Sequence, residues 1–137
     1  MGLDIGDRRI GVAFGDSELR MATPAEVIVR ASREQDVRVI ADFVHRYEVT
    51  KIIVGLPRNI DGTLGPQAQA VIAYTQSIAS LIDLPVEFWD ERLSTVEATK
   101  RTHETGARGK KSRRHIDAIA AAVILQDYLD SQPNEIS

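Results

Sequence analysis

The sequence has no cysteine, few aromatic side chains (5%) and no apolar run long enough to cross a membrane. Without cysteine, a disulfide framework and a thiolate metal site are both excluded, and a reducing compartment is favoured. No signal peptide is visible, so we expect a cytoplasmic protein without a membrane partner. The net charge of −3 excludes a polycation that binds nucleic acid over its whole surface, so a basic surface must be local.

The composition that remains is that of an ordinary globular protein, with 43% apolar and 27% charged residues in a chain of 137. This length suggests one domain with a single hydrophobic core. We expect that domain to span residues 1–130 and to be followed by a flexible C-terminal tail over residues 131–137.

The order of elements indicates an α/β fold. Apolar runs predict five strands, over residues 1–6, 10–15, 26–30, 51–55 and 85–89. Helical spacing predicts four helices, over residues 33–47, 66–82, 94–104 and 114–129. A hairpin turn joins the first two strands, and the later strand–helix–strand units require parallel neighbours. We therefore expect a mixed five-stranded sheet, with three antiparallel strands and then two parallel ones, flanked by helices.

Acidic residues stand where the pattern calls for apolar side chains or where strands end. Asp4 interrupts the first buried strand, Asp90 and Glu91 end the fifth, and Asp117 lies on the apolar stripe of the last helix. A buried carboxylate without a partner costs several kcal/mol. Because sites in such sheets form at the carboxyl ends of parallel strands, these acids could meet. Carboxylates without cysteine or a histidine pair suit Mg²⁺ or Mn²⁺, which can promote phosphodiester cleavage.

Each of these acids also has a simpler interpretation. Asp4 could form a structural ion pair with Arg8 or Arg9. Asp117 could stabilise the N-terminus of its helix, where a negative charge gains about 0.3–1 kcal/mol. The acids that end the fifth strand could pair with Arg92. The joint pattern, rather than any one acid, favours the metal site.

Two segments could bind phosphate. Residues 106–115 contain five lysines and arginines, and this segment, predicted as a loop to residue 114, leads directly to Asp117. A solvated loop without a partner is the alternative. The second segment, residues 55–66, follows a buried strand and opens onto a helix N-terminus, which favours anions. It is not a phosphate-binding Walker A loop, because no Gly-Lys-Ser/Thr ends it.

Four segments, in this order, together resemble the YqgF (RuvX) family. They are LDIGDRRIGVA (3–13), GLPRNIDGT with GPQA (55–63 and 65–68), DERLSTVEA (90–98) and DAIAA (117–121). Members of this family are described as candidate pre-16S rRNA nucleases and as Holliday-junction-resolvase-like proteins. Any one segment alone would be a weak match, whereas the four in order are specific, and the resemblance as a whole covers residues 2 to about 129.

The resemblance implies a ribonuclease H-like fold and a metal-dependent nuclease that acts on ribosomal precursor RNA. It implies that Asp4, Glu91 and Asp117 are the catalytic residues and the ligands of Mg²⁺ or Mn²⁺. Only the resemblance favours Glu91 over Asp90. We expect substrate contacts from the family segments and from the basic segment, at Arg8, Arg9, Asn59, Arg92, Ser94, Thr95, Arg108, Lys110, Lys111 and Arg113.

Three other functions compete with this one. A Holliday-junction-resolvase-like DNA nuclease would use the same acids on DNA. A nucleic-acid-binding assembly factor without cleavage would keep the basic segment and give the acids a structural role. An actin-like ATPase also opens on a Leu-Asp-Ile-Gly strand, but it needs two lobes and a second phosphate loop, for which 137 residues leave no room. Nothing in the sequence indicates an oligomeric state.

Overall fold

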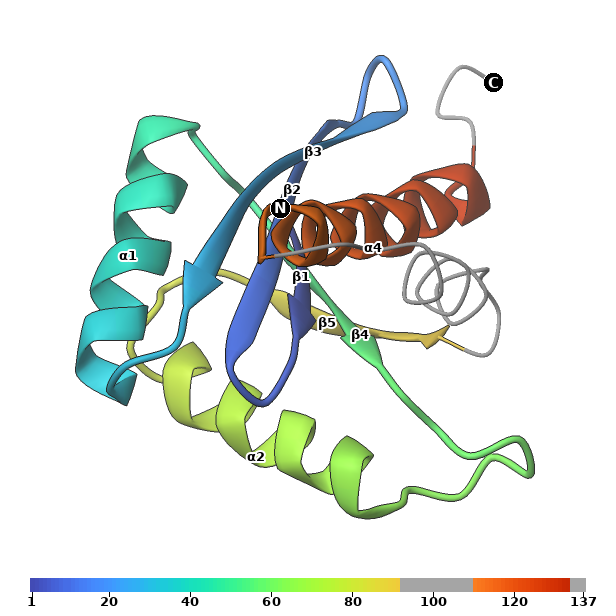
Figure 1. Cartoon of the computed structure of the whole chain (residues 1–137). Helices are drawn as coiled ribbons and strands as arrows, with labels where there is room; N and C mark the ends of the chain where they lie inside the picture. The colour runs from blue at the N-terminus through green and yellow to red at the C-terminus, as the bar shows by residue number, and fades with distance from the viewer. Residues whose placement is uncertain (92–109, 134–137) are drawn as a thin grey trace.

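The fold is a mixed sheet with helices on both faces (Figure 1). The computed structural model describes residues 1–91 and 110–133. The elements run in the order β1 (Gly2–Ile5), β2 (Arg9–Asp16), β3 (Met21–Val29), α1 (Arg33–Arg46), β4 (Ile52–Leu56), α2 (Pro66–Ala79), β5 (Val86–Asp90) and α4 (Lys110–Ser131). The strand order is β3-β2-β1-β4-β5. β2 pairs antiparallel with β1 and β3, and β4 pairs parallel with β1 and β5, which confirms the predicted sheet.

One face of the sheet carries large aliphatic side chains and packs against α1 and α2. Because successive residues of a strand point to opposite faces, alternate positions supply this core. Its strand residues are Leu3, Ile5, Ile10, Val12, Ile52, Val54 and Leu56, and its helix residues include Ile40, Phe43, Val71 and Ile78. Pro66 is the first residue of α2, as the sequence predicts, because its missing N–H has no partner there in any case.

The other face is covered by α4 (Figure 1), and small residues stand where the helix comes closest to the strands. A Cβ atom added to Gly2 would lie 2.9 Å from the main-chain oxygen of Ala121. A Cβ added to Gly11 would lie 1.9 Å from the main-chain oxygen of Asp117. On α4 itself, the side chains of Ala120 and Ala121 are fully buried. The helix therefore lies so close to the sheet that side chains at these strand positions would not fit.

β3 is longer than predicted, because it begins at Met21 and not at residue 26. Proline cannot donate a hydrogen bond to a neighbouring strand, so Pro24 is an unusual residue within a strand. In the structure, Pro24 lies on an edge strand opposite Ala13, where the register with β2 shifts by a bulge. Edge strands and bulges are the two places in a sheet that tolerate proline.

α4 begins at Lys110, so the prediction of a loop as far as residue 114 is wrong for its last residues. Lysine and arginine are good helix formers, and the basic stretch contains no proline to prevent the apolar helix from extending backwards through it. The helix continues to Ser131, two residues past its predicted end. The helix predicted over residues 94–104 lies outside the described residues.

Candidate active site

Asp4 lies on the central strand and faces α4. Its residue is only 5% exposed. It pairs with Gly11 of β2, and the register of β1 with β4 continues by one residue to place it beside Gly55. Asp4 is therefore flanked on both sides by glycines, which let the main chain of Asp117 approach over Gly11 and the carboxylate of Glu91 approach over Gly55.

Glu91 reaches the same place from the end of β5. It is also 5% exposed, and its Oε1 lies 2.6 Å from the position that a Cβ of Gly55 would take. Its carboxylate therefore lies over Gly55, next to Asp4. Asp90 is one residue out of phase and lies 3.9 Å from Arg58 (Nε to Oδ2). This placement favours Glu91 over Asp90 as the neighbour of Asp4.

Asp117 projects from α4 toward the β1–β2 turn. Arg9 Nε donates a hydrogen bond of 2.6 Å to its Oδ2, with the two side chains 34% and 20% exposed. The interpretation that Asp117 serves the helix N-terminus is wrong, because α4 begins seven residues earlier and the dipole effect fades within the first turn. Arg9, which was a candidate for a structural ion pair with Asp4, forms an ion pair with Asp117.

A pocket of about 240 Å³ opens beside Asp117, at the carboxyl end of β1. It is lined by Gly6, Asp7, Arg8, Arg9 and Asp117. The structure thus brings two predicted substrate contacts, both arginines, to one of the predicted acids. A pocket with guanidinium groups beside carboxylates is suited to a phosphate group that approaches a cation-binding site.

Three residues that the sequence analysis missed hold this turn in place. Arg30 Nη1 donates to the main-chain oxygen of Gly6 at 2.7 Å, and its guanidinium lies 4.1 Å from the centre of the Tyr74 ring. The Tyr74 hydroxyl donates to Asp36 Oδ2 at 2.8 Å. Burial, followed by this bond to Asp36, raises the pKa of the Tyr74 phenol. No local pattern reveals contacts between three separate elements, so only the fold could show them.

The loop after β4 ends at the same edge of the sheet. Asn59, a predicted substrate contact, donates from Nδ2 to Thr63 Oγ1 at 2.9 Å and so stabilises the loop itself. Lys110, Lys111 and Arg113 lie on the first turn of α4, ahead of Asp117. The other predicted contacts, Arg92, Ser94, Thr95 and Arg108, lie outside the described residues.

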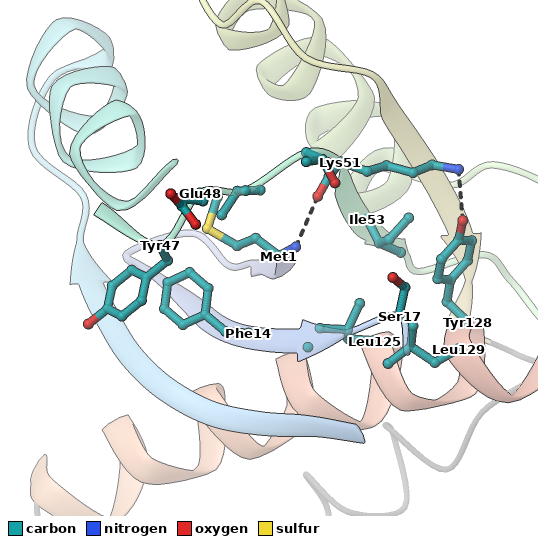
Figure 2. A pocket seen from close by; sticks show the side chains of 13 residues that line it. Met1, Phe14, Ser17, Tyr47, Glu48, Lys51, Ile53, Leu125, Tyr128 and Leu129 are labelled. Atoms are coloured by element: carbon teal, nitrogen blue, oxygen red, sulfur yellow. Dashed lines mark hydrogen bonds between the residues drawn. The ribbon is translucent and has the colours of Figure 1, made fainter. Parts of the chain in front are cut away.

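A second pocket, of about 320 Å³, lies at the opposite edge of the sheet, between the start of β1 and the second half of α4 (Figure 2). Lys51 donates to the Tyr128 hydroxyl at 2.7 Å and pairs with Glu87 at 2.6 Å. The hydrogen bond to Glu87, followed by that to Tyr128, raises the pKa of Lys51. None of the predicted catalytic acids lines this pocket.

Comparison with known proteins gives the family of the chain. Residues 1–131 match the RuvX family, described as "Holliday junction resolvase". The chain belongs to the RuvX family. It is 48% identical to the "Putative pre-16S rRNA nuclease" of Halothermothrix orenii, over 96% of this chain and 94% of that protein. It is 46% identical to the protein of the same name from Desulforamulus reducens, over 96% of each chain.

The structure also resembles a distant solved one. The chain superposes on "T. thermophilus RuvC in complex with Holliday junction substrate" with a TM-score of 0.53 and 14% sequence identity, covering 95% of this chain and 94% of that one. This likeness concerns the fold, and it confirms that the RuvX chain has a ribonuclease H-like architecture. Among the described helices, none has the length and apolar character needed to cross a bilayer.

The residue types of the RuvX site suit a hard cation, but their positions in this structure do not form a complete ligand set. Carboxylate oxygens are the ligands that Mg²⁺ and Mn²⁺ prefer, and Gly55 lets the carboxylate of Glu91 approach the strand position beside Asp4. Asp4 and Glu91 lie near one another, whereas Asp117 is directed to Arg9. Within residues 1–91 and 110–133, no three acidic or histidine side chains are arranged to hold a metal ion.

Proposed function

We propose that this RuvX-family chain is a metal-dependent nuclease of the cytoplasm that hydrolyses phosphodiester bonds at the 5′ end of pre-16S ribosomal RNA. The observation that carries the proposal is the pair of buried carboxylates, Asp4 and Glu91, beside glycines at the carboxyl ends of parallel strands. Asp117 lies on the helix that covers them. The names of the relatives support the RNA substrate.

In this proposal, Asp4, Glu91 and Asp117 would hold Mg²⁺ or Mn²⁺. When bound, such an ion supplies an activated water and stabilises the oxygen that leaves the phosphorus. Arg8 and Arg9 line the pocket beside Asp117 and would bind and orient the phosphate. The remaining proposed substrate contacts would position the RNA strand further along, at Asn59, Arg92, Ser94, Thr95, Arg108, Lys110, Lys111 and Arg113.

The test is cleavage of a pre-16S RNA fragment that carries its 5′ extension, with Mg²⁺ or Mn²⁺ and with a chelator. Loss of a residue that merely orients a ligand costs 10–100-fold, so Asp4→Asn should lower the rate by more than about 100-fold. Asp42→Asn is the matched control, because Asp42 is an exposed acid that pairs with Arg46 on α1. We expect wild-type cleavage from this control. Metal-dependent cleavage that persists in Asp4→Asn would contradict the assignment.

The same cleavage assay distinguishes two other functions. The family description favours a Holliday-junction DNA substrate, so a four-way DNA junction should be assayed beside the RNA. A higher kcat/KM on the junction would replace RNA by DNA in the proposal. Binding without cleavage in either metal would indicate an assembly factor. If about four phosphates are bound, log affinity should fall with log salt at a slope of roughly −3.

A further inference from the structure

Asp117 already has a cation as its partner. The Arg9 guanidinium donates from Nε to Oδ2 at 2.6 Å, and both side chains are partly withdrawn from solvent at the edge of the small pocket. A divalent ion at this carboxylate would meet a positive charge within bonding distance of the same group. Two cations so close repel each other, and they compete for the same lone pairs.

The main chain holds both residues of this contact in place. Arg9 begins β2, and its main-chain oxygen accepts a bond of 2.9 Å from Gly6 N across the turn. Arg30 holds that turn through Gly6, and its main-chain N–H donates to the oxygen of Arg8 at 2.8 Å. On the other side, the backbone of Asp117 is fixed against Gly11. Rigid backbones therefore bring the two side chains together.

We propose that Arg9 and the divalent metal compete for the carboxylate of Asp117, so that Arg9 occupies this ligand until the metal displaces it. This inference rests on the proposed function, in which Asp117 is a metal ligand. In the absence of metal, Arg9 neutralises one of the three acids. In its presence, Asp117 turns toward Asp4 and Glu91, and the arginine is released toward the pocket.

The experiment is a titration of the full chain with Mn²⁺, followed by the electron paramagnetic resonance signal of the free ion. Arg9→Gln removes the competing charge, so it should bind Mn²⁺ roughly tenfold more tightly, which is about the strength of one hydrogen bond to a charged group. Asp117→Asn should bind Mn²⁺ more weakly. In the Asp117→Asn background, Arg9→Gln should add nothing, because the group for which they compete is gone.

Two further variants keep the test decisive. Arg46→Gln removes an arginine whose ion pair with Asp42 is exposed on α1, and it should bind Mn²⁺ as the wild type does. Arg9→Lys retains the charge but loses the directed Nε–H bond, so it should tighten binding by about threefold. This variant gives the answer if a melting curve without metal shows that Arg9→Gln is unfolded.

The outcomes separate the two proposals. Unchanged or weaker Mn²⁺ binding in the Arg9 variants, together with weaker binding in Asp117→Asn, would overturn the competition and leave the metal site standing. Wild-type Mn²⁺ binding in Asp117→Asn would overturn the proposed ligand set, and the competition with it. Tighter binding in the Arg9 variants that disappears in the Asp117→Asn background would support both.

Discussion

The two faces of the sheet are built from the same strands but serve different purposes. On β1, Leu3 points into the aliphatic core under α1 and α2, whereas Asp4 points toward α4. On β4, Val54 belongs to the core and Gly55 makes space for the carboxylate of Glu91. Core residues and site residues thus alternate at these positions of β1 and β4. The alternation separates the residues that stabilise the fold from those that form the site.

This division has an energetic reason. Fully burying a leucine, isoleucine or valine side chain contributes roughly 1.5–3 kcal/mol, so the aliphatic face can supply most of the stability. The face toward α4 gains less where Gly11, Gly55 and Asp4 stand, because glycine buries no side chain and a buried carboxylate costs free energy. A site that needs small residues and charge can therefore be placed there without weakening the main core.

The largest effect should follow from damage to the aliphatic face. Leu3 is fully buried at the centre of the sheet, so Leu3→Ala leaves a cavity and should destabilise the protein by about 3 kcal/mol. Leu81→Ala is the matched control, because Leu81 is 58% exposed and its loss should change stability by less than about 0.5 kcal/mol. Urea unfolding measures both. Equal effects would show that this face is not the main source of stability.

Adding a side chain between the sheet and α4 should cost less stability but should disturb the candidate site. In Gly11→Ala, the new Cβ would meet the main chain of Asp117 at 1.9 Å, so α4 must shift. We expect a loss of about 1–3 kcal/mol and weaker Mn²⁺ binding. Gly15→Ala is the comparison, since its Cβ would meet the movable end of the Leu125 side chain at 2.8 Å. Unfolding and Mn²⁺ titration should both rank Gly11→Ala as the more severe change.

The smallest effect concerns Tyr74, where the aliphatic side reaches the turn that carries Arg9. Its phenol has a raised pKa, so above its ordinary value of 10.0 the unfolded chain loses a proton that the folded chain keeps. Stability is therefore fully present below pH 10.0 and declines above it. Tyr74→Phe lacks this decline. Urea unfolding at about pH 9 and about pH 11 gives the loss of stability with pH. This loss should be larger in the wild type than in Tyr74→Phe, by less than about 1 kcal/mol because solvent screens this half-buried group. An equal loss of unfolding free energy with pH in the two proteins would contradict the raised pKa.

Much of the fold could be predicted because its signals are local. Apolar alternation indicated the strands, and the spacing of Ala120, Ile124 and Tyr128 indicated the buried face of the last helix, which the structure confirms. The start of β3 could not be predicted, because Pro24 is tolerated only through a bulge with β2. The start of α4 was missed because a charged stretch without apolar spacing shows no amphipathic pattern, although its residues favour helix.

The candidate site also has parts that the sequence reveals and parts that only the fold reveals. Asp4 and Asp117 could be picked out as acids at apolar positions, and the preference for Glu91 came only from the family resemblance. The contacts of Arg9 with Asp117 and of Arg30 with Tyr74 join residues far apart in the sequence. The role of the glycines had a visible signal in the sequence, which is Gly11 and Gly15 on one face of β2 and Gly55 within the apolar run of β4.

The most direct measurement is anomalous diffraction from crystals of the protein soaked in Mn²⁺. The account predicts an anomalous peak bound by Asp4, Glu91 and Asp117 on the face under α4, with the side chain of Asp117 turned away from Arg9. Strong peaks only at other places, with Asp117 still bonded to Arg9 at high Mn²⁺, would contradict it.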